Sequence, residues 1–162
     1  MKRSKNLFAF FAVIIWCNIC MGQQDLEQVT VRSFLKDILV NESYDPQVIS
    51  KKYIEFQPLD KNINTGKVNG QREQMVKNHL EEINKKYRTL YDPKRTKILP
   101  FNKLDSAQQI PFDSTIVDHV YAVIFNTNTL MYLWVEGQKI KAFDLYMQKG
   151  SGNNASAYFL TY

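Results

Sequence analysis

The sequence predicts an α+β fold in which N-terminal helices pack on a C-terminal antiparallel sheet, arranged as a meander. Two observations predict it. Apolar residues recur every three or four positions up to about residue 91, which is typical of amphipathic helices, and they alternate with a period of two from residue 117 onwards, which is typical of strands. Helices first and consecutive strands last is the element order of the α+β class.

The first 22 residues are expected to be a signal peptide that precedes this fold. "MKRSK" is basic, "LFAFFAVIIWC" is a continuous apolar run, and a more mixed stretch then ends in Gly22. Cleavage after Gly22 leaves a single domain over residues 23–162, exported to the periplasm of a Gram-negative bacterium or secreted. Two alternatives stay open. In the first, the apolar run is not cleaved and anchors the chain in a membrane, although it is shorter than the ~20 residues of a spanning helix. In the second, a lipid is attached at Cys17 or Cys20.

The charge of the chain depends on this cleavage. The sequence has 21 basic and 16 acidic residues, and removal of Lys2, Arg3 and Lys5 leaves 18 basic residues, so the net charge falls from +5 to +2. A nucleic-acid-binding role thereby loses its main support. Both cysteines are removed as well, which excludes disulfides, thiolate metal sites and cysteine catalysis in the mature chain.

The first elements follow from apolar spacing and from capping residues. A helix is predicted over residues 26–39. A second begins at Asp45-Pro46 and runs through Tyr53, with Val48, Ile49 and Tyr53 pointing inward. The stretch "FQPLDKNINTGKVNGQ" is predicted to be a loop or an irregular edge strand because it contains a proline and two glycines. The residues expected to point inward from the first helix are Leu26, Val29, Val31, Phe34, Leu35, Ile38 and Leu39.

A long helix is predicted over residues 71–91, ended by Asp92-Pro93. Its apolar stripe consists of Met75, Val76, Leu80, Ile83, Tyr87 and Leu90. "TKILPF" is a candidate strand. The period-two pattern then predicts strands over residues 117–125, 130–136, 139–147 and 157–162, joined by "NTNT", a turn at Gly137 and "KGSGNN".

Alternation along these strands predicts two sheet faces, provided that the first two turns contain an even number of residues. One face is predicted to be aromatic and the other aliphatic. The aromatic face carries His119, Tyr121, Val123, Phe125, Leu130, Tyr132, Trp134, Lys141, Phe143 and Leu145. The aliphatic face carries Asp118, Val120, Ala122, Ile124, Met131, Leu133, Val135, Ile140, Ala142 and Asp144.

Neither face suits solvent, because single domains rarely expose a large apolar patch, and the helices cover only one of them. Three interpretations of the aromatic face stay open: sheet curvature and loops close it, it forms a homodimer interface, or it binds a ligand or partner. The candidate binding residues are Tyr121, Tyr132, Trp134 and Phe143, with Lys141 steering an anionic end of a ligand.

Few residues are suited to catalysis. His79 lies beside the apolar stripe of the long helix and His119 lies near a strand start. Each is expected to be structural, with a cavity position as the alternative. No catalytic residue, metal site or cofactor is predicted, because the sequence contains no HExxH, Gly-x-Ser-x-Gly or P-loop pattern.

The element order over residues 26–162 resembles the NTF2-like family of the cystatin-like superfamily, an α+β cone. The resemblance rests on two helices, an irregular stretch, a long helix and a run of strands, and not on a short motif. It implies a curved sheet that wraps the long helix around a cavity, and dimerisation through the sheet in many members. Catalytic members often use an Asp or His in the cavity. Here Asp118 and His119 are strand neighbours that point to opposite faces, so no catalytic residue is carried over.

Together these observations favour a small exported, non-catalytic protein of the bacterial envelope that binds a protein partner or a small apolar ligand through the aromatic face. Two alternatives stay open. One is a metal-independent hydrolase or isomerase, and the other is a subunit of a larger envelope complex.

Overall fold

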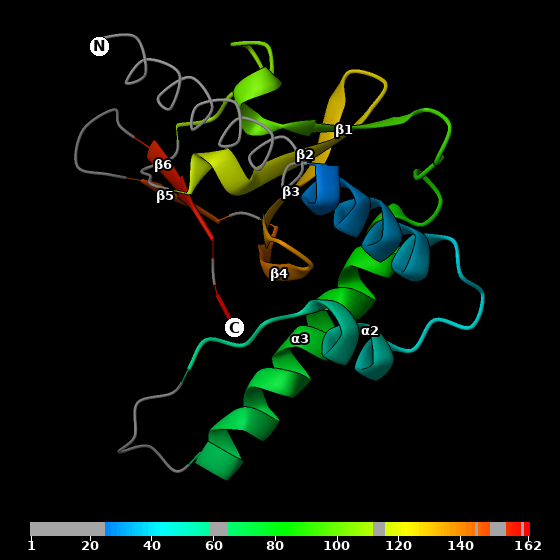
Figure 1. The fold of residues 1–162 in the computed structure, drawn as a ribbon, viewed down its shortest axis with the longest axis vertical. Coiled ribbons are helices and arrows are strands. Elements are labelled where there is room, and N and C mark those ends of the chain that lie inside the picture. Colours follow the sequence, from blue (N-terminus) through cyan, green and yellow to red (C-terminus); the bar gives the residue numbers. More distant parts are fainter. Residues whose placement is uncertain (1–24, 59–64, 112–115, 145, 150–154, 160) are drawn as a thin grey trace, which may run out of the picture.

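The α+β architecture is confirmed by the computed structural model, which describes residues 25–58, 65–111, 116–144, 146–149, 155–159 and 161–162 (Figure 1). In these ranges the helices lie over residues 25–39, in α2 (Pro46–Tyr53) and in α3 (Thr65–Tyr87), and they precede the main sheet along the chain. The expected signal peptide lies outside the described residues. None of the helices in the described ranges is both long and apolar enough to cross a bilayer.

The helix starts show which local signals decide the structure. α2 begins as predicted, because the Asp45 side chain accepts hydrogen bonds from the backbone N–H groups of Gln47 and Val48 and Pro46 occupies the first turn. The predicted bounds of the long helix are wrong at both ends: α3 begins at Thr65 and ends at Tyr87. Its first turns extend away from the rest of the molecule (Figure 1). A helical glycine costs only about 1 kcal/mol relative to alanine, so the glycines in these turns weaken the helix without ending it.

The main sheet is an antiparallel meander in the order β1-β2-β3-β4. Its strands are β1 (Thr96–Pro100), β2 (Val120–Phe125), β3 (Asn128–Glu136) and β4 (Lys139–Phe143), and a separate hairpin pairs β5 (Tyr146–Lys149) with β6 (Ala155–Tyr158). The strand predicted over residues 139–147 is interrupted at Asp144, which has a φ of 63°. The strand predicted from residue 117 begins instead with a 3-10 turn, η2 (Val117–His119), and a second 3-10 turn, η1 (Phe101–Lys103), follows β1.

The sheet separates two apolar layers. On one face the helices pack against the sheet, and Figure 1 shows them gathered on that side. The buried sheet residues of this layer are Ile98, Tyr121, Val123, Met131, Leu133, Val135, Ile140 and Phe143. On the other face a smaller cluster is formed by Phe101, Leu104, Val120, Ala122, Ile124 and Tyr132, with Leu99, Ile110, Ile116, Val117 and Phe159 packed against it. Both faces are therefore covered by the chain itself over much of their area.

The predicted division of the sheet into an aromatic and an aliphatic face is wrong, because the ladder contains two register shifts. The β2–β3 turn does contain an even number of residues, since Phe125 pairs with Asn128, but the register shifts between Val123 and Ile124, and Leu130 is the extra residue of β3. The register of β3 and β4 shifts again between Trp134 and Val135, and Lys141 is the extra residue of β4. Each bulge moves the following side chains to the opposite face.

Five residues predicted to point inward are exposed: Leu26, Val29, Val48, Met75 and Leu90. In the first helix their place against the sheet is taken by polar residues, because Glu27 and Thr30 are both buried. Thr30 donates to the Gly137 carbonyl at 3.2 Å, and the Gln28 amide donates to the Ile98 carbonyl at 2.6 Å. The first helix is thus attached to the sheet through hydrogen bonds as well as apolar contacts.

Candidate functional site

The five predicted binding residues do not form one surface. Tyr121 and Phe143 are fully buried in the helix-facing layer, whereas Tyr132 and Trp134 belong to the opposite face. Lys141 is the bulge residue between these sets. The structure therefore divides the predicted site, and only Tyr132 and Trp134 of these residues lie on the face away from the helices.

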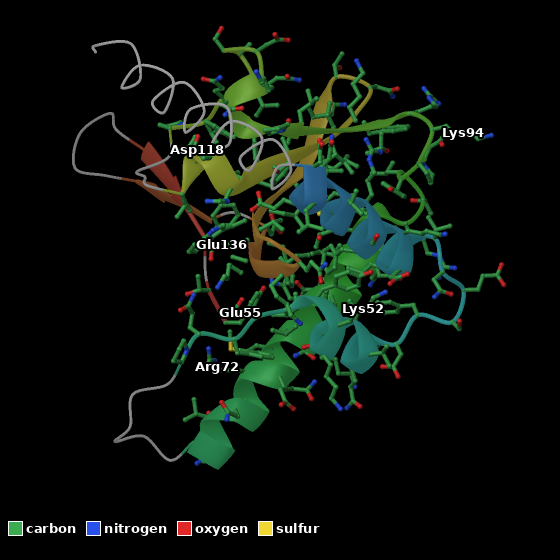
Figure 2. The ribbon with its side chains drawn as sticks, viewed as in Figure 1. Lys52, Glu55, Arg72, Lys94, Asp118 and Glu136 are labelled. Atoms are coloured by element: carbon green, nitrogen blue, oxygen red, sulfur yellow. The ribbon has the colours of Figure 1, made fainter. Side chains whose placement is uncertain are left out.

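Lys141 is surrounded by acidic side chains. Its Nζ atom lies 2.9 Å from Glu55 Oε1 and 3.3 Å from Glu136 Oε2, and its side chain is 13% exposed. Figure 2 shows Glu55 and Glu136 on the same side of the molecule, next to β4. The hydrogen bond to Glu55 raises the pKa of the lysine against the lowering effect of burial. Two carboxylates already balance this charge, which leaves little of it for an anionic ligand.

Trp134 is the most accessible of the predicted aromatic residues. It is half-buried, its indole N–H donates to Glu136 Oε1 at 3.2 Å, and its ring centroid lies 6.4 Å from that of Phe159. Tyr132 on the same face is buried, and its hydroxyl donates to the Gln108 carbonyl at 2.8 Å. Of the four predicted aromatic binding residues, Trp134 alone is thereby left partly accessible, next to Phe159 and Glu136.

A polar cluster missed in the sequence centres on Glu27, which is 1% exposed. Its Oε1 atom accepts a hydrogen bond from Nδ1 of His119 at 3.0 Å and another from the Gly137 N–H at 3.2 Å. Its Oε2 atom accepts from the Tyr121 hydroxyl at 3.1 Å. Burial, and then the charge of Glu27, raise the pKa of Tyr121 above its usual range, so this phenol stays protonated as a donor.

The cluster fixes the imidazole of His119. Because a buried carboxylate accepts from Nδ1, the neutral ring carries its proton there and Nε2 is the basic nitrogen. The His119 side chain is 34% exposed, as expected for a residue near a strand start. A carboxylate behind an accessible imidazole is an arrangement that can hold or transfer a proton. Within the described residues, however, no group of three or more His, Cys, Asp or Glu side chains could hold a metal ion.

A second histidine cluster lies between α3 and the end of β4. His79 is 15% exposed, its ring centroid lies 4.7 Å from that of Phe143, and its Nδ1 atom is hydrogen-bonded to the Tyr162 hydroxyl. Nε2 of His79 lies 3.8 Å from Asp144 Oδ2. His79 is therefore a partnered residue at the edge of the core, and the partners, Asp144 and Tyr162, are ones that the sequence did not single out.

The surface hollows described here do not include either histidine. A hollow of about 160 Å³ lies between α2 and α3, beside Ser50, Phe56 and Gln74. A second, of about 240 Å³, is lined by Leu26, Val29, Tyr53 and the turn after β3, and a third of about 300 Å³ follows the end of the first helix. An enzyme that uses a histidine as its general base needs that histidine to open into a cavity. Neither His79 nor His119 lines any of these three hollows.

Comparisons with known proteins add no assignment. No family model matches the chain, and no curated protein or solved structure matches it. The NTF2-like cone therefore stays a prediction from the order of elements.

Proposed function

We propose that this chain is a small exported, non-catalytic protein of the bacterial envelope that binds a protein partner or a small apolar ligand through Trp134 and Phe159. The observation that supports it is the position of Trp134. This large aromatic side chain is half-buried near the end of β3, on a sheet face where Val120, Ala122, Ile124 and Tyr132 are buried. Indole rings with one apolar face and one bonded N–H are favoured at binding surfaces.

The proposed binding surface is smaller than the aromatic face predicted from the sequence. Tyr121 and Phe143 contribute to the core instead of the binding surface, and Lys141 is paired with acids. Glu136 beside the indole favours a ligand or partner that is apolar with a hydrogen-bond donor, and disfavours an anionic one. A homodimer through the same residues is the form of this proposal in which the partner is a second copy.

The test uses the fluorescence of Trp134 in the expected mature chain, residues 23–162, where it is the sole tryptophan. We expect emission that acrylamide quenches readily, together with binding of the neutral apolar dye N-phenyl-1-naphthylamine, which carries one N–H donor. Trp134→Ala should weaken dye binding about tenfold, because the lost contact with the indole ring costs about 1.4 kcal/mol, and should leave the circular dichroism unchanged. Leu90→Ala, which removes an exposed apolar side chain in the turn after α3, is the matched control.

One result would contradict the proposal, and another would identify the partner as a second copy of the chain. A blue-shifted emission that resists quenching in a monomer would place Trp134 in a closed core. The same emission in a chain of twice the monomer mass, measured by light scattering, would assign the surface to self-association alone.

The Glu27–His119 pair supports a second candidate, a metal-independent hydrolase that uses His119 as a general base. The supporting observation is the buried carboxylate 3.0 Å from Nδ1. General base catalysis contributes about a hundredfold or more. We therefore expect His119→Ala to lower the rate of p-nitrophenyl acetate hydrolysis at least about tenfold, with Lys103→Ala as an exposed control. Equal rates for the two variants would remove this candidate.

A further inference from the structure

Tyr162 occupies an aromatic slot between α3 and the end of β4. The residue is 6% exposed, although it belongs to no helix or strand and follows the end of β6 at Tyr158. Its ring centroid lies 5.1 Å from that of Phe143, at an interplanar angle of 35°, and 6.1 Å from that of His79. Phe143 is itself supported by Phe34, at 5.9 Å between ring centroids. The walls of the slot thus belong to helices and to β4, whereas Tyr162, which fills it, lies outside every helix and strand.

The polar contacts of the slot fit the hydroxyl of a phenol. The Tyr162 hydroxyl is hydrogen-bonded to Nδ1 of His79, while Asp144 Oδ2 lies 3.8 Å from Nε2 of the same ring. A carboxylate on the Nε2 side favours the tautomer with its proton on Nε2, so that Nδ1 accepts a hydrogen bond from the hydroxyl. The slot therefore combines an apolar wall for a flat ring with one acceptor at its end.

We propose that this slot is a binding site for a small phenolic ligand and that Tyr162 is its resident occupant. Such ligands carry one aromatic ring and one hydroxyl, as the tyrosine side chain does. Near the ring the backbone of Tyr162 is held by a hydrogen bond from the Gln57 N–H to the Tyr162 carbonyl, at 2.6 Å. A free phenol competes with a tethered one, so the affinity of the native chain for it is the intrinsic affinity of the slot multiplied by the fraction of slots that Tyr162 leaves empty.

This site is independent of the surface proposed above. Phe143 and His79 belong to the helix-facing side of the sheet, whereas Trp134 lies on the other face. The phenol is therefore expected to leave the emission of Trp134 unchanged while it shifts the signals of His79. Loss of one proposal would not decide the other.

The experiment is a titration of the full chain with p-cresol, followed through the ring signals of His79 by nuclear magnetic resonance. We expect a saturable shift in the wild type. We also expect at least about tenfold tighter binding in Tyr162→Ala, because the competing side chain is gone. Toluene, which has the same ring without the hydroxyl, should bind Tyr162→Ala about five- to tenfold more weakly than p-cresol.

The control variant is Tyr162→Phe, which keeps the ring in the slot and removes only its hydroxyl. It should bind p-cresol more tightly than the wild type and more weakly than Tyr162→Ala. The wild-type titration needs no variant, so it decides the question even if Tyr162→Ala does not fold. Absence of a saturable shift in the wild type up to the solubility of p-cresol would overturn the proposal. Equal affinities of Tyr162→Ala for p-cresol and toluene would overturn it as well.

Discussion

Glu27 is the residue at which the cost of burial and its compensation are most visible. A carboxylate removed from water is strongly unfavourable unless hydrogen bonds replace its hydration. Here three donors do so, from His119, Tyr121 and the Gly137 backbone. These donors lie in η2, in β2 and in the turn after β3. The Glu27 carboxylate can therefore reach all three of them in only one placement of the first helix against the sheet. Glu27 therefore contributes specificity to the fold as well as stability.

We expect Glu27→Gln to lower the free energy of unfolding by about 2–3 kcal/mol, because the amide loses the charge and directs its own N–H group at donors. The value is below that of a fully buried ion pair because His119 is partly exposed. Glu82→Gln, an exposed change on α3, should stay within about 0.5 kcal/mol of the wild type. Urea unfolding measures both. A loss below about 0.5 kcal/mol for Glu27→Gln would show that the cluster does not stabilise the fold.

Two glycines show how the same residue type has opposite roles in different elements. Gly70 lies in the exposed part of α3, and Gly137 lies in the two-residue turn between β3 and β4 with a φ of 59°. A methyl group at either position would meet no atom within 4 Å. The difference between them is therefore in the backbone and not in packing.

We expect Gly70→Ala to raise the free energy of unfolding by about 0.5–1 kcal/mol, since alanine is the better helix former. Gly137→Ala should lower it by about 1 kcal/mol, since a side chain disfavours positive φ. Each variant is the control of the other, and urea midpoints give both values. Equal effects of the same sign would mean that the turn after β3 relaxes to another geometry.

The elements were largely predictable, but the sheet faces were not. Asp45-Pro46 predicts the start of α2 because capping is a local interaction. The bulges at Leu130 and Lys141 depend on the register in which two strands pair to bury their side chains. Neither residue is of a type that indicates a bulge in the sequence. One bulge was enough to place Tyr121 opposite Leu133 instead of Tyr132, which divided the predicted site between two faces.

The sequence does contain one signal of the buried cluster around Glu27. Glu27 shares helix spacing with Val31, Phe34 and Ile38, so an acid stood within the apolar stripe of the first helix. A carboxylate at such a position indicates a buried partner. The identity of that partner was not predictable, because His119 lies 92 positions away and is brought close only by the complete sheet.

At the scale of the whole molecule, the tyrosines link the fold to pH. The chain has nine tyrosines, and burial raises the pKa of Tyr44 to about 12. Burial raises the pKa of four others above the usual value of 10, namely Tyr53, Tyr91, Tyr121 and Tyr132. The unfolded chain ionises these phenols at ordinary pKa values, whereas the folded chain resists ionisation. Their contribution to stability is therefore complete below about pH 10 and is lost as the pH rises above it.

We expect the free energy of unfolding to fall steeply above pH 10, and absorbance at 295 nm to report buried phenolates only when the circular dichroism changes. Tyr44→Phe should make the fall between pH 10 and 12 shallower. It should cost little at neutral pH, because no partner is found for the buried Tyr44 hydroxyl among the described residues. Ionisation of all nine phenols before any loss of helix would contradict this link.

The contacts of Glu27 also set an order in time. Its partners His119, Tyr121 and Gly137 are 92, 94 and 110 positions further along the chain, and Gln28 reaches Ile98 across 70 positions. During synthesis the first helix therefore emerges long before the residues that donate hydrogen bonds to its buried Glu27 carboxylate. The chain gains its stable docked state only after residue 137 has left the ribosome, and contacts of such separation form slowly. A nascent chain with these contacts therefore stays incompletely folded for most of its synthesis.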